Sequence, residues 1–171
     1  MSSPEFAPQP HPGPVQIWEE LARQSKDLFR RGELLRALAV CEAARVFALA
    51  HFNQWPTPDD ALAAAMVSHF NLADTQARAG WLPEASATLC HAHGSLLAVI
   101  NDAQAHPGLR QAASRHMHRS LLALAQFQSA HGERREIAQL LRQHGQAISA
   151  TRAERDHGGE AETTEVPRVL H

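Results

Sequence analysis

Two sets of polar residues recur at helical spacing in the first half of the sequence. Their members are separated by three and then four residues: Arg23, Lys26 and Arg30 in the first set, and Asn71, Asp74 and Arg78 in the second. Residues at this spacing project from one side of an α-helix. Arginine and asparagine suit the recognition of carboxylates or of an extended peptide backbone. The sets therefore predict a basic, hydrogen-bonding surface; the alternative is two ordinary solvated helix faces.

Twelve histidines and two cysteines raise the question of a metal site. A helix presents two ligands to one metal ion when they are three or four residues apart, whereas His91 and His93 are only two apart and point to different sides. The same holds for His116 and His118. Cys90 and His93 have a usable spacing, but two further ligands would have to come from elsewhere. We therefore expect no metal and no cofactor.

No catalytic motif accompanies these residues. The sequence contains no glycine-rich phosphate loop, no Gly-x-Ser-x-Gly and no His-Glu-x-x-His pattern. The adjacent acids Asp59 and Asp60 are better explained as charges that favour the first turn of a helix than as an acid–base pair. We therefore expect a protein that is not an enzyme.

Composition favours an all-α protein. Aromatic residues make up 5% of the chain, tyrosine is absent, and alanine and leucine recur throughout, which is typical of packed helices rather than of sheets. Two cysteines cannot build a disulfide framework, and we interpret Cys41 as a small core residue. No signal-peptide pattern and no run of 18 apolar residues occurs. We expect a soluble cytoplasmic protein without membrane contact.

Apolar periodicity of the helical kind is confined to residues 15–152, which we predict to be one helical domain. Residues 1–14 are rich in proline, and residues 153–171 are acidic and lack an apolar face. We expect the first segment to be a disordered arm and the second a disordered tail.

Three glycines divide the helical domain into pairs of helices. Gly32, Gly80 and Gly132 each follow an apolar-periodic run, where a left-handed helix end favours a residue without a Cβ atom. Each glycine therefore predicts the turn of an antiparallel hairpin. The clearest helix start is at Thr57, a capping residue, with Asp60 at the third helical position, where its carboxylate can reach back to a free backbone amide.

The hairpin glycines are 48 and 52 residues apart, and such a near-regular period indicates stacked helix pairs. The central copy resembles the tetratricopeptide repeat in the pattern Leu72-Ala73…Gly80…Ala85…Leu89…Ala92. The first copy resembles it less closely, in Leu21…Leu28…Gly32…Ala37…Cys41…Ala44, and the third is poor beyond its glycine. The consensus tryptophan and tyrosine are absent, and the helices are longer than in the family's repeat of about 34 residues.

This resemblance implies six helices in three stacked antiparallel hairpins that form a right-handed superhelix. It also implies a binding surface on the concave side, made by the first helix of each hairpin. Carried over by position, that surface comprises Arg23, Lys26, Arg30, Phe70, Asn71, Asp74, Arg78, Arg119, Leu122 and Gln126. Asn71 stands where the family often places an asparagine that binds peptide.

The combined prediction is a protein–protein interaction module, either an adaptor or a dedicated chaperone, that holds a peptide or helix of its partner in a concave groove. Small bacterial secretion chaperones of similar length are similar in having three such repeats. The alternative is a nucleic-acid-binding or regulatory protein that uses residues 107–153, where seven arginines accompany two glutamates. A homodimer could also form through exposed apolar residues such as Leu96, Leu97, Val99 and Ile100.

Overall fold

The computed structural model describes residues 12–145, and every regular element among them is a helix. The elements are α1 (Pro14–Arg30), α2 (Leu34–Ala50), the short 3-10 helix η1 (Phe52–Gln54), α3 (Pro58–Arg78), α4 (Leu82–Asn101) and α5 (Pro107–His131). A sixth α-helix begins at residue 135 and reaches residue 145, the last one described. The predicted all-α class with six helices is therefore confirmed.

The boundaries of the helical domain are described in part. α1 begins at Pro14, one residue before the predicted start. The rest of the predicted arm, up to residue 11, and the whole predicted tail lie outside the described residues. Between residues 12 and 145, no helix is long and apolar enough to cross a lipid bilayer.

The three predicted hairpin glycines all adopt the left-handed backbone conformation, with φ of 77° at Gly32, 82° at Gly80 and 84° at Gly132. At the second of these turns the amide of Gly80 donates to the carbonyl of Ala77 at 3.0 Å, and the amide of Trp81 donates to that of Gln76 at 2.8 Å. This pair of bonds satisfies carbonyls that the helix end leaves free. The predicted glycine with positive φ after each of the three helices is therefore confirmed, although at Gly132 the ψ of 169° departs from the left-handed helical value.

The start of α3 follows the prediction except in one bond. The hydroxyl oxygen of Thr57 accepts a hydrogen bond from the amide of Asp60 at 3.1 Å, as a cap should. The carboxylate of Asp60, however, accepts the hydroxyl proton of Thr57 at 2.7 Å. The Asp60 carboxylate therefore bonds to the hydroxyl of the capping residue Thr57 and not, as predicted from the sequence, to a free backbone amide.

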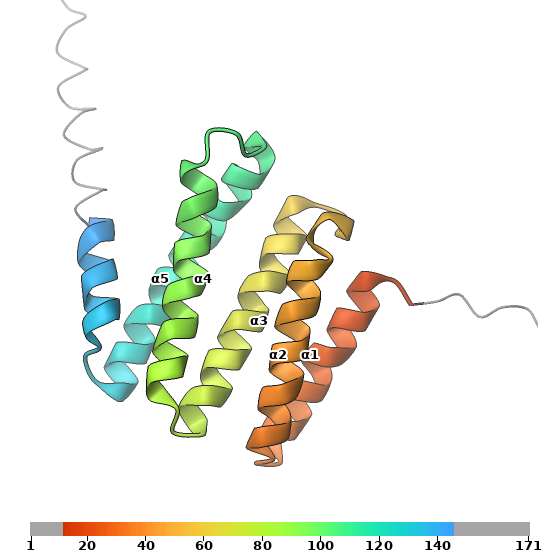
Figure 1. The fold of residues 1–171 in the computed structure, drawn as a ribbon, viewed down its shortest axis with the longest axis vertical. Coiled ribbons are helices and arrows are strands. Elements are labelled where there is room, and N and C mark those ends of the chain that lie inside the picture. The colour runs from red at the N-terminus through yellow and green to blue at the C-terminus, as the bar shows by residue number, and fades with distance from the viewer. Residues whose placement is uncertain (1–11, 146–171) are drawn as a thin grey trace, which may run out of the picture.

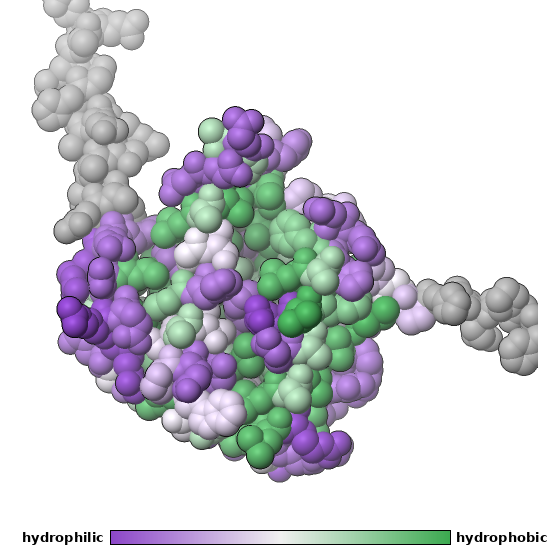
Figure 2. Space-filling view, in the orientation of Figure 1, coloured by the Kyte–Doolittle hydropathy of each residue, from purple (hydrophilic) through white to green (hydrophobic). Residues whose placement is uncertain are grey.

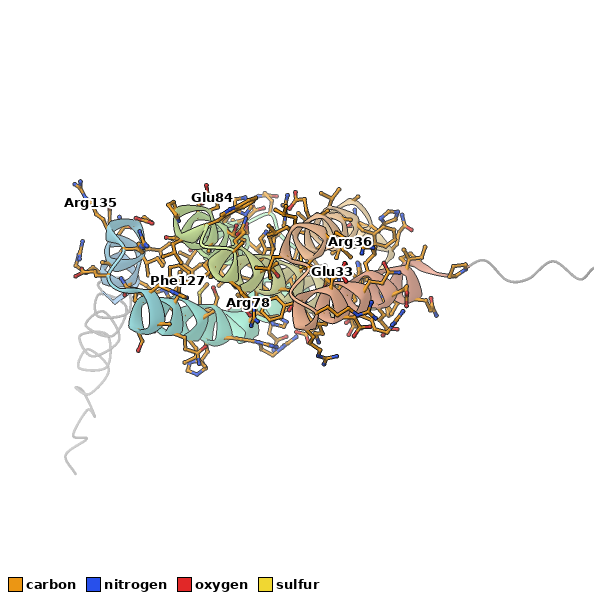
Figure 3. All side chains as sticks on the ribbon, turned by 90° about the horizontal axis from the view of Figure 1, so that it is seen from below. Glu33, Arg36, Arg78, Glu84, Phe127 and Arg135 are labelled. Carbon is orange, nitrogen blue, oxygen red and sulfur yellow. The ribbon has the colours of Figure 1, made fainter. Side chains whose placement is uncertain are left out.

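Each helix packs against its neighbour in the chain, and α3 also contacts α1 and α5 (Figure 1). Seen at a right angle to that view, α2 and α4 lie in one layer and α1 and α5 in the other (Figure 3). The largest buried cluster joins α3, α4 and α5 through Leu62, Met66, Leu96, Ala113 and Met117. Cys41 is buried between α2 and α3 with Leu38 and Leu72, which confirms its predicted place in the core.

The apolar residues named for a dimer near the end of α4 are less exposed than expected. Leu96 has no exposed surface, and Leu97, Val99 and Ile100 are partly buried against the cluster around it. The cause is α5, which at 25 residues is long enough to cover this part of α4. A dimer through these residues stays a prediction.

The two glycines Gly80 and Gly94 provide a test of the turn geometry. A Cβ atom added at either position would meet nothing within 4 Å, so a substitution by alanine changes only backbone preference. Gly80→Ala should lower the free energy of unfolding by about 1–2 kcal/mol, because φ is positive there. Gly94→Ala, inside α4, should raise it by about 0.5–1 kcal/mol. Urea unfolding measures both, and shifts of the same sign would contradict this account.

Candidate partner-binding groove

A hollow of about 600 Å³ opens on the layer that contains α1 and α5, with α3 between them. We call it the central groove. It is lined by Phe29, Phe70, Asp74, Ala77, Arg78, Leu89, Arg119, Leu122, Ala123, Gln126, Phe127, Ala130 and His131. Figure 3 shows Arg78 at the junction of α1 and α5, and Phe127 on α5. Residues of α1, α3 and α5, together with Leu89 of α4, therefore build one surface.

All ten residues of the predicted binding surface lie on this side of the molecule. Six of them line the central groove: Phe70, Asp74, Arg78, Arg119, Leu122 and Gln126. A second hollow of about 270 Å³ shares Phe29 and Asp74 with the groove, and it contains three further predicted residues: Lys26, Arg30 and Asn71. The tenth residue, Arg23, lines a third hollow together with Lys26 and Arg30. Shared lining residues make these hollows one continuous surface.

Two arginines of the central groove rest on aromatic rings. The guanidinium carbon of Arg78 lies 4.9 Å from the ring centre of Phe29, and that of Arg119 lies 5.8 Å from the ring centre of Phe70. These are cation–π distances, and such contacts contribute about 0.5–1 kcal/mol at exposed sites. Neither guanidinium forms an ion pair with a carboxylate of residues 12–145. The groove therefore presents two positioned cations whose charge is not neutralised.

Two of the three predicted cations of α1, Arg23 and Arg30, differ from these arginines because they form ion pairs. Arg23 pairs with Glu20 at 2.6 Å and with Asp27 at 3.1 Å, and Arg30 pairs with Asp27 at 3.3 Å. All of these groups are exposed, and exposed pairs of this kind contribute little to stability. A ligand carboxylate could exchange with these partners at low cost, but it would meet less free positive charge here than at Arg78.

Asp74 is the one acid among the residues that line the central groove. Its side chain reaches solvent, yet the surrounding groove walls desolvate it, and this raises the pKa of its carboxyl group above the ordinary value. His131 opposes that effect. The ionised form of Asp74 is therefore less stable than that of a fully solvated aspartate. A hydrogen bond donated by a ligand would lower the free-energy cost of that charge.

One family of proteins matches the part of the chain that builds this surface. A family model described as "Protein of unknown function (DUF2753)" matches residues 16–157. The chain belongs to the DUF2753 family. The match includes every groove residue from Arg23 to His131. No curated protein and no solved structure matches this DUF2753 chain.

Sequence reasoning missed three aromatic residues of the DUF2753 groove. Phe29 lies under Arg78, and the ring centre of Phe127 is 4.8 Å from that of His131, four residues further along α5, with the two rings tilted. Phe29 is three residues after Lys26, so helical spacing alone could have placed it on the binding face. Phe127 is 7% exposed and serves the core as well as the groove, and such a double role leaves no distinct sequence signal.

The arginines of residues 107–153 do not act alike in the DUF2753 fold. Arg115 donates from Nη2 to the carboxylate of Asp59 at 2.8 Å, which ties α5 to the start of α3. Arg119, one turn later, lies in the central groove, whereas Arg152 is outside the described residues. The alternative function, nucleic-acid binding through the arginines of residues 107–153, stays a prediction, and no contact among the described residues favours it.

The histidine and cysteine residues considered for metal binding differ in exposure: His93 is buried, His116 and Cys90 are partly buried, and His91 and His118 are exposed. His93 has no exposed surface, its Nδ1 lies 3.2 Å from the hydroxyl of Ser120, and burial lowers its pKa to about 4. Burial likewise raises the pKa of the Cys90 thiol, which disfavours the thiolate that a metal needs. Within residues 12–145, no three histidine, cysteine or acidic side chains are close enough to hold a metal ion.

The electrostatics of Asp74 can be tested with Asp59 as its counterpart. Because the folded chain raises the pKa of Asp74, ionisation destabilises it once the pH exceeds the unfolded value of about 3.9. Asp74→Asn should therefore raise the free energy of unfolding at pH 7, by less than about 1 kcal/mol because the side chain reaches solvent. The gain should vanish near pH 3.

Asp59→Asn should act in the opposite direction. Arg115 holds the pKa of Asp59 below its ordinary value, so this carboxylate stabilises the folded chain at neutral pH and the contribution is lost as the pH falls. Urea unfolding of both variants at the two pH values makes the comparison. A loss of stability in Asp74→Asn at pH 7 would contradict the assigned desolvation.

Proposed function

We propose that this chain is a protein–protein interaction module that takes a peptide or a helix of its partner into the central groove. The observation that carries this proposal is the pair of arginines, Arg78 and Arg119, held over Phe29 and Phe70 without a carboxylate partner among residues 12–145. A positioned guanidinium binds carboxylates well, because less side-chain entropy is lost when the hydrogen bonds form. An adaptor or a dedicated chaperone would use such a groove.

The chemistry of the groove favours a partner segment that combines acidic and apolar side chains. Leu122 is 48% exposed on the groove wall and offers an apolar contact. Gln126 in the groove and Asn71 in the adjoining hollow can hydrogen-bond to peptide backbone. A segment with carboxylates opposite the two arginines and an aliphatic or aromatic side chain between them would complement this surface.

We further propose that the six helices are three antiparallel hairpins stacked as a tetratricopeptide-like right-handed superhelix. The order of helix contacts along the chain and the left-handed glycine at each of the three turns support this arrangement. A cytoplasmic location fits two cysteines that are both free of disulfide bonds. We propose no catalytic role.

Selection from a random peptide display library tests the proposed ligand chemistry without a known partner. Peptides selected on the full-length chain should be enriched in aspartate or glutamate near leucine or phenylalanine. The double variant Arg78→Glu/Arg119→Glu should weaken their binding at least about tenfold in fluorescence anisotropy, since each charge-assisted bond contributes about 1.5–3 kcal/mol. Circular dichroism should show an unchanged helical signal, because Arg78 and Arg119 are exposed.

The matched control is Arg135→Glu/Arg142→Glu, which changes the net charge equally on exposed residues of the sixth helix. Arg135 lies on the opposite side of the molecule from Arg78 (Figure 3). Equal loss of binding in both double variants would indicate a general charge effect and would end the groove proposal. Binding of DNA or RNA at low salt, lost steeply at moderate salt, would instead favour the alternative function.

A further inference from the structure

The solvent-facing side of α2 is mostly apolar. Within Leu34–Ala50 the exposed residues are Leu35, Arg36, Ala39, Ala43, Val46, Leu49 and Ala50. Arg36 is the one charged residue in that set, and Leu35, Val46 and Leu49 are 72%, 51% and 41% exposed. Glu42 is less exposed as a whole residue, but its side chain is 47% exposed. We call the six apolar residues the α2 stripe. Figure 2 shows hydrophobic side chains gathered along α2 on the face in view.

The neighbouring helix shows how unusual this composition is. Every exposed residue of α1 is polar or charged: Gln16, Glu19, Glu20, Arg23, Gln24, Lys26 and Arg30. A helix that is hydrophobic on all sides is normally covered on all sides. α2 packs against α1 and α3, and no described helix covers the stripe. The stripe therefore has the composition of an interface rather than of a solvent-exposed surface.

The order of large and small residues in the stripe is self-complementary. Leu35, Ala39, Val46 and Ala50 follow one line along α2, at successive spacings of four, seven and four residues. A two-fold axis between positions 42 and 43 pairs Leu35 of one copy with Ala50 of the other, and Ala39 with Val46. Each large side chain then meets a small one, which allows two antiparallel helices to approach closely.

The charges beside the stripe permit the same pairing. Arg45 donates from Nε to the carboxylate of Glu42 at 2.9 Å, on the flank of the line that also holds Leu49. The two-fold axis brings the Glu42–Arg45 pairs of both copies to one side. The axis also brings the two Glu42 carboxylates near each other, and each keeps its own Arg45 as an ion-pair partner. The two guanidinium groups therefore offset part of the repulsion between the carboxylates.

We propose that the α2 stripe is the interface of a homodimer in which two copies of α2 pack antiparallel. A helix of 17 residues is about 25 Å long, and two such faces in contact bury on the order of 1,000 Å², the lower bound for a specific interface. The dimer is therefore weak and concentration-dependent. It leaves the central groove of each copy open, because the groove lies in the layer of α1 and α5.

A second copy fits the stripe better than another part of this chain does. The described chain ends at residue 145 on the sixth helix, which lies at the opposite edge of the fold from α2 (Figure 1). Residues 1–11, which precede α1, are rich in proline and contain a single large apolar side chain besides Met1, that of Phe6. A segment with one such side chain cannot contact the large residues at both ends of the stripe, Leu35 and Leu49, at the same time.

Sedimentation velocity of the full-length chain tests the dimer. Between about 1 µM and 1 mM, the range for a weak interface, the weight-average mass should rise reversibly from monomer to dimer. Ala39→Glu should weaken the dimer at least about tenfold, because it places a charge in the desolvated contact. The control Ala125→Glu changes an exposed alanine of α5 in the same way and should dimerise like the wild type. A monomer at every concentration, or unaltered dimerisation of Ala39→Glu, would overturn the proposal.

A second experiment tests the register of the pairing. Ala39→Leu alone should weaken the dimer about tenfold, because it faces Val46 of the other copy and overpacks the contact. Adding Val46→Ala to that variant should restore the wild-type affinity, since large again meets small. Both positions are exposed in the monomer, so both variants should keep the wild-type helical signal. Failure of the second change to rescue the first would reject this register.

Discussion

The structure depends on the burial of α3 between four other helices. α1, α2, α4 and α5 all contact it, and ten of its 21 residues are buried. Ala61, Ala64, Ala65 and Ala73 are each at most 2% exposed, and their small side chains let the neighbouring helices approach closely. The other helices are positioned largely by how they fit against α3.

Burial on this scale favours partners for the polar groups of α3, and most find them within the helix, although the buried Nε2 of His69 has none among the described residues. Ser68, His69 and Thr75 each bond to the carbonyl four residues earlier, at 2.7–2.8 Å. Two of these side chains also reach other helices. Trp18 of α1 donates to the hydroxyl of Ser68 at 2.8 Å, and Cys41 of α2 lies 3.6 Å from that of Thr75. These contacts set the position of α1 and α2 along α3.

The central groove follows from the same arrangement, because one side of α3 stays uncovered between α1 and α5. Its two arginines that form no ion pair among residues 12–145 each lie over the ring of an adjacent helix: Arg78 of α3 over Phe29 of α1, and Arg119 of α5 over Phe70 of α3. The proposed binding surface is thus ordered by helix packing, which would lower the entropy lost on binding a ligand. The α2 stripe is in the other layer, so a dimer would present two such surfaces.

The sequence by itself determined the features that depend on residues close together in the chain. A positive φ at Gly80 needs only a residue without a Cβ atom, the Thr57 cap needs only its own first turn, and the shared face of Asn71 and Arg78 needs only helical spacing. Tertiary structure decided which of these faces are covered. Leu96 is buried because α5 extends over it, whereas Val46 of α2 is left exposed, although both are apolar residues on helices. Burial depends on the neighbours that long-range packing supplies, and periodicity does not specify them.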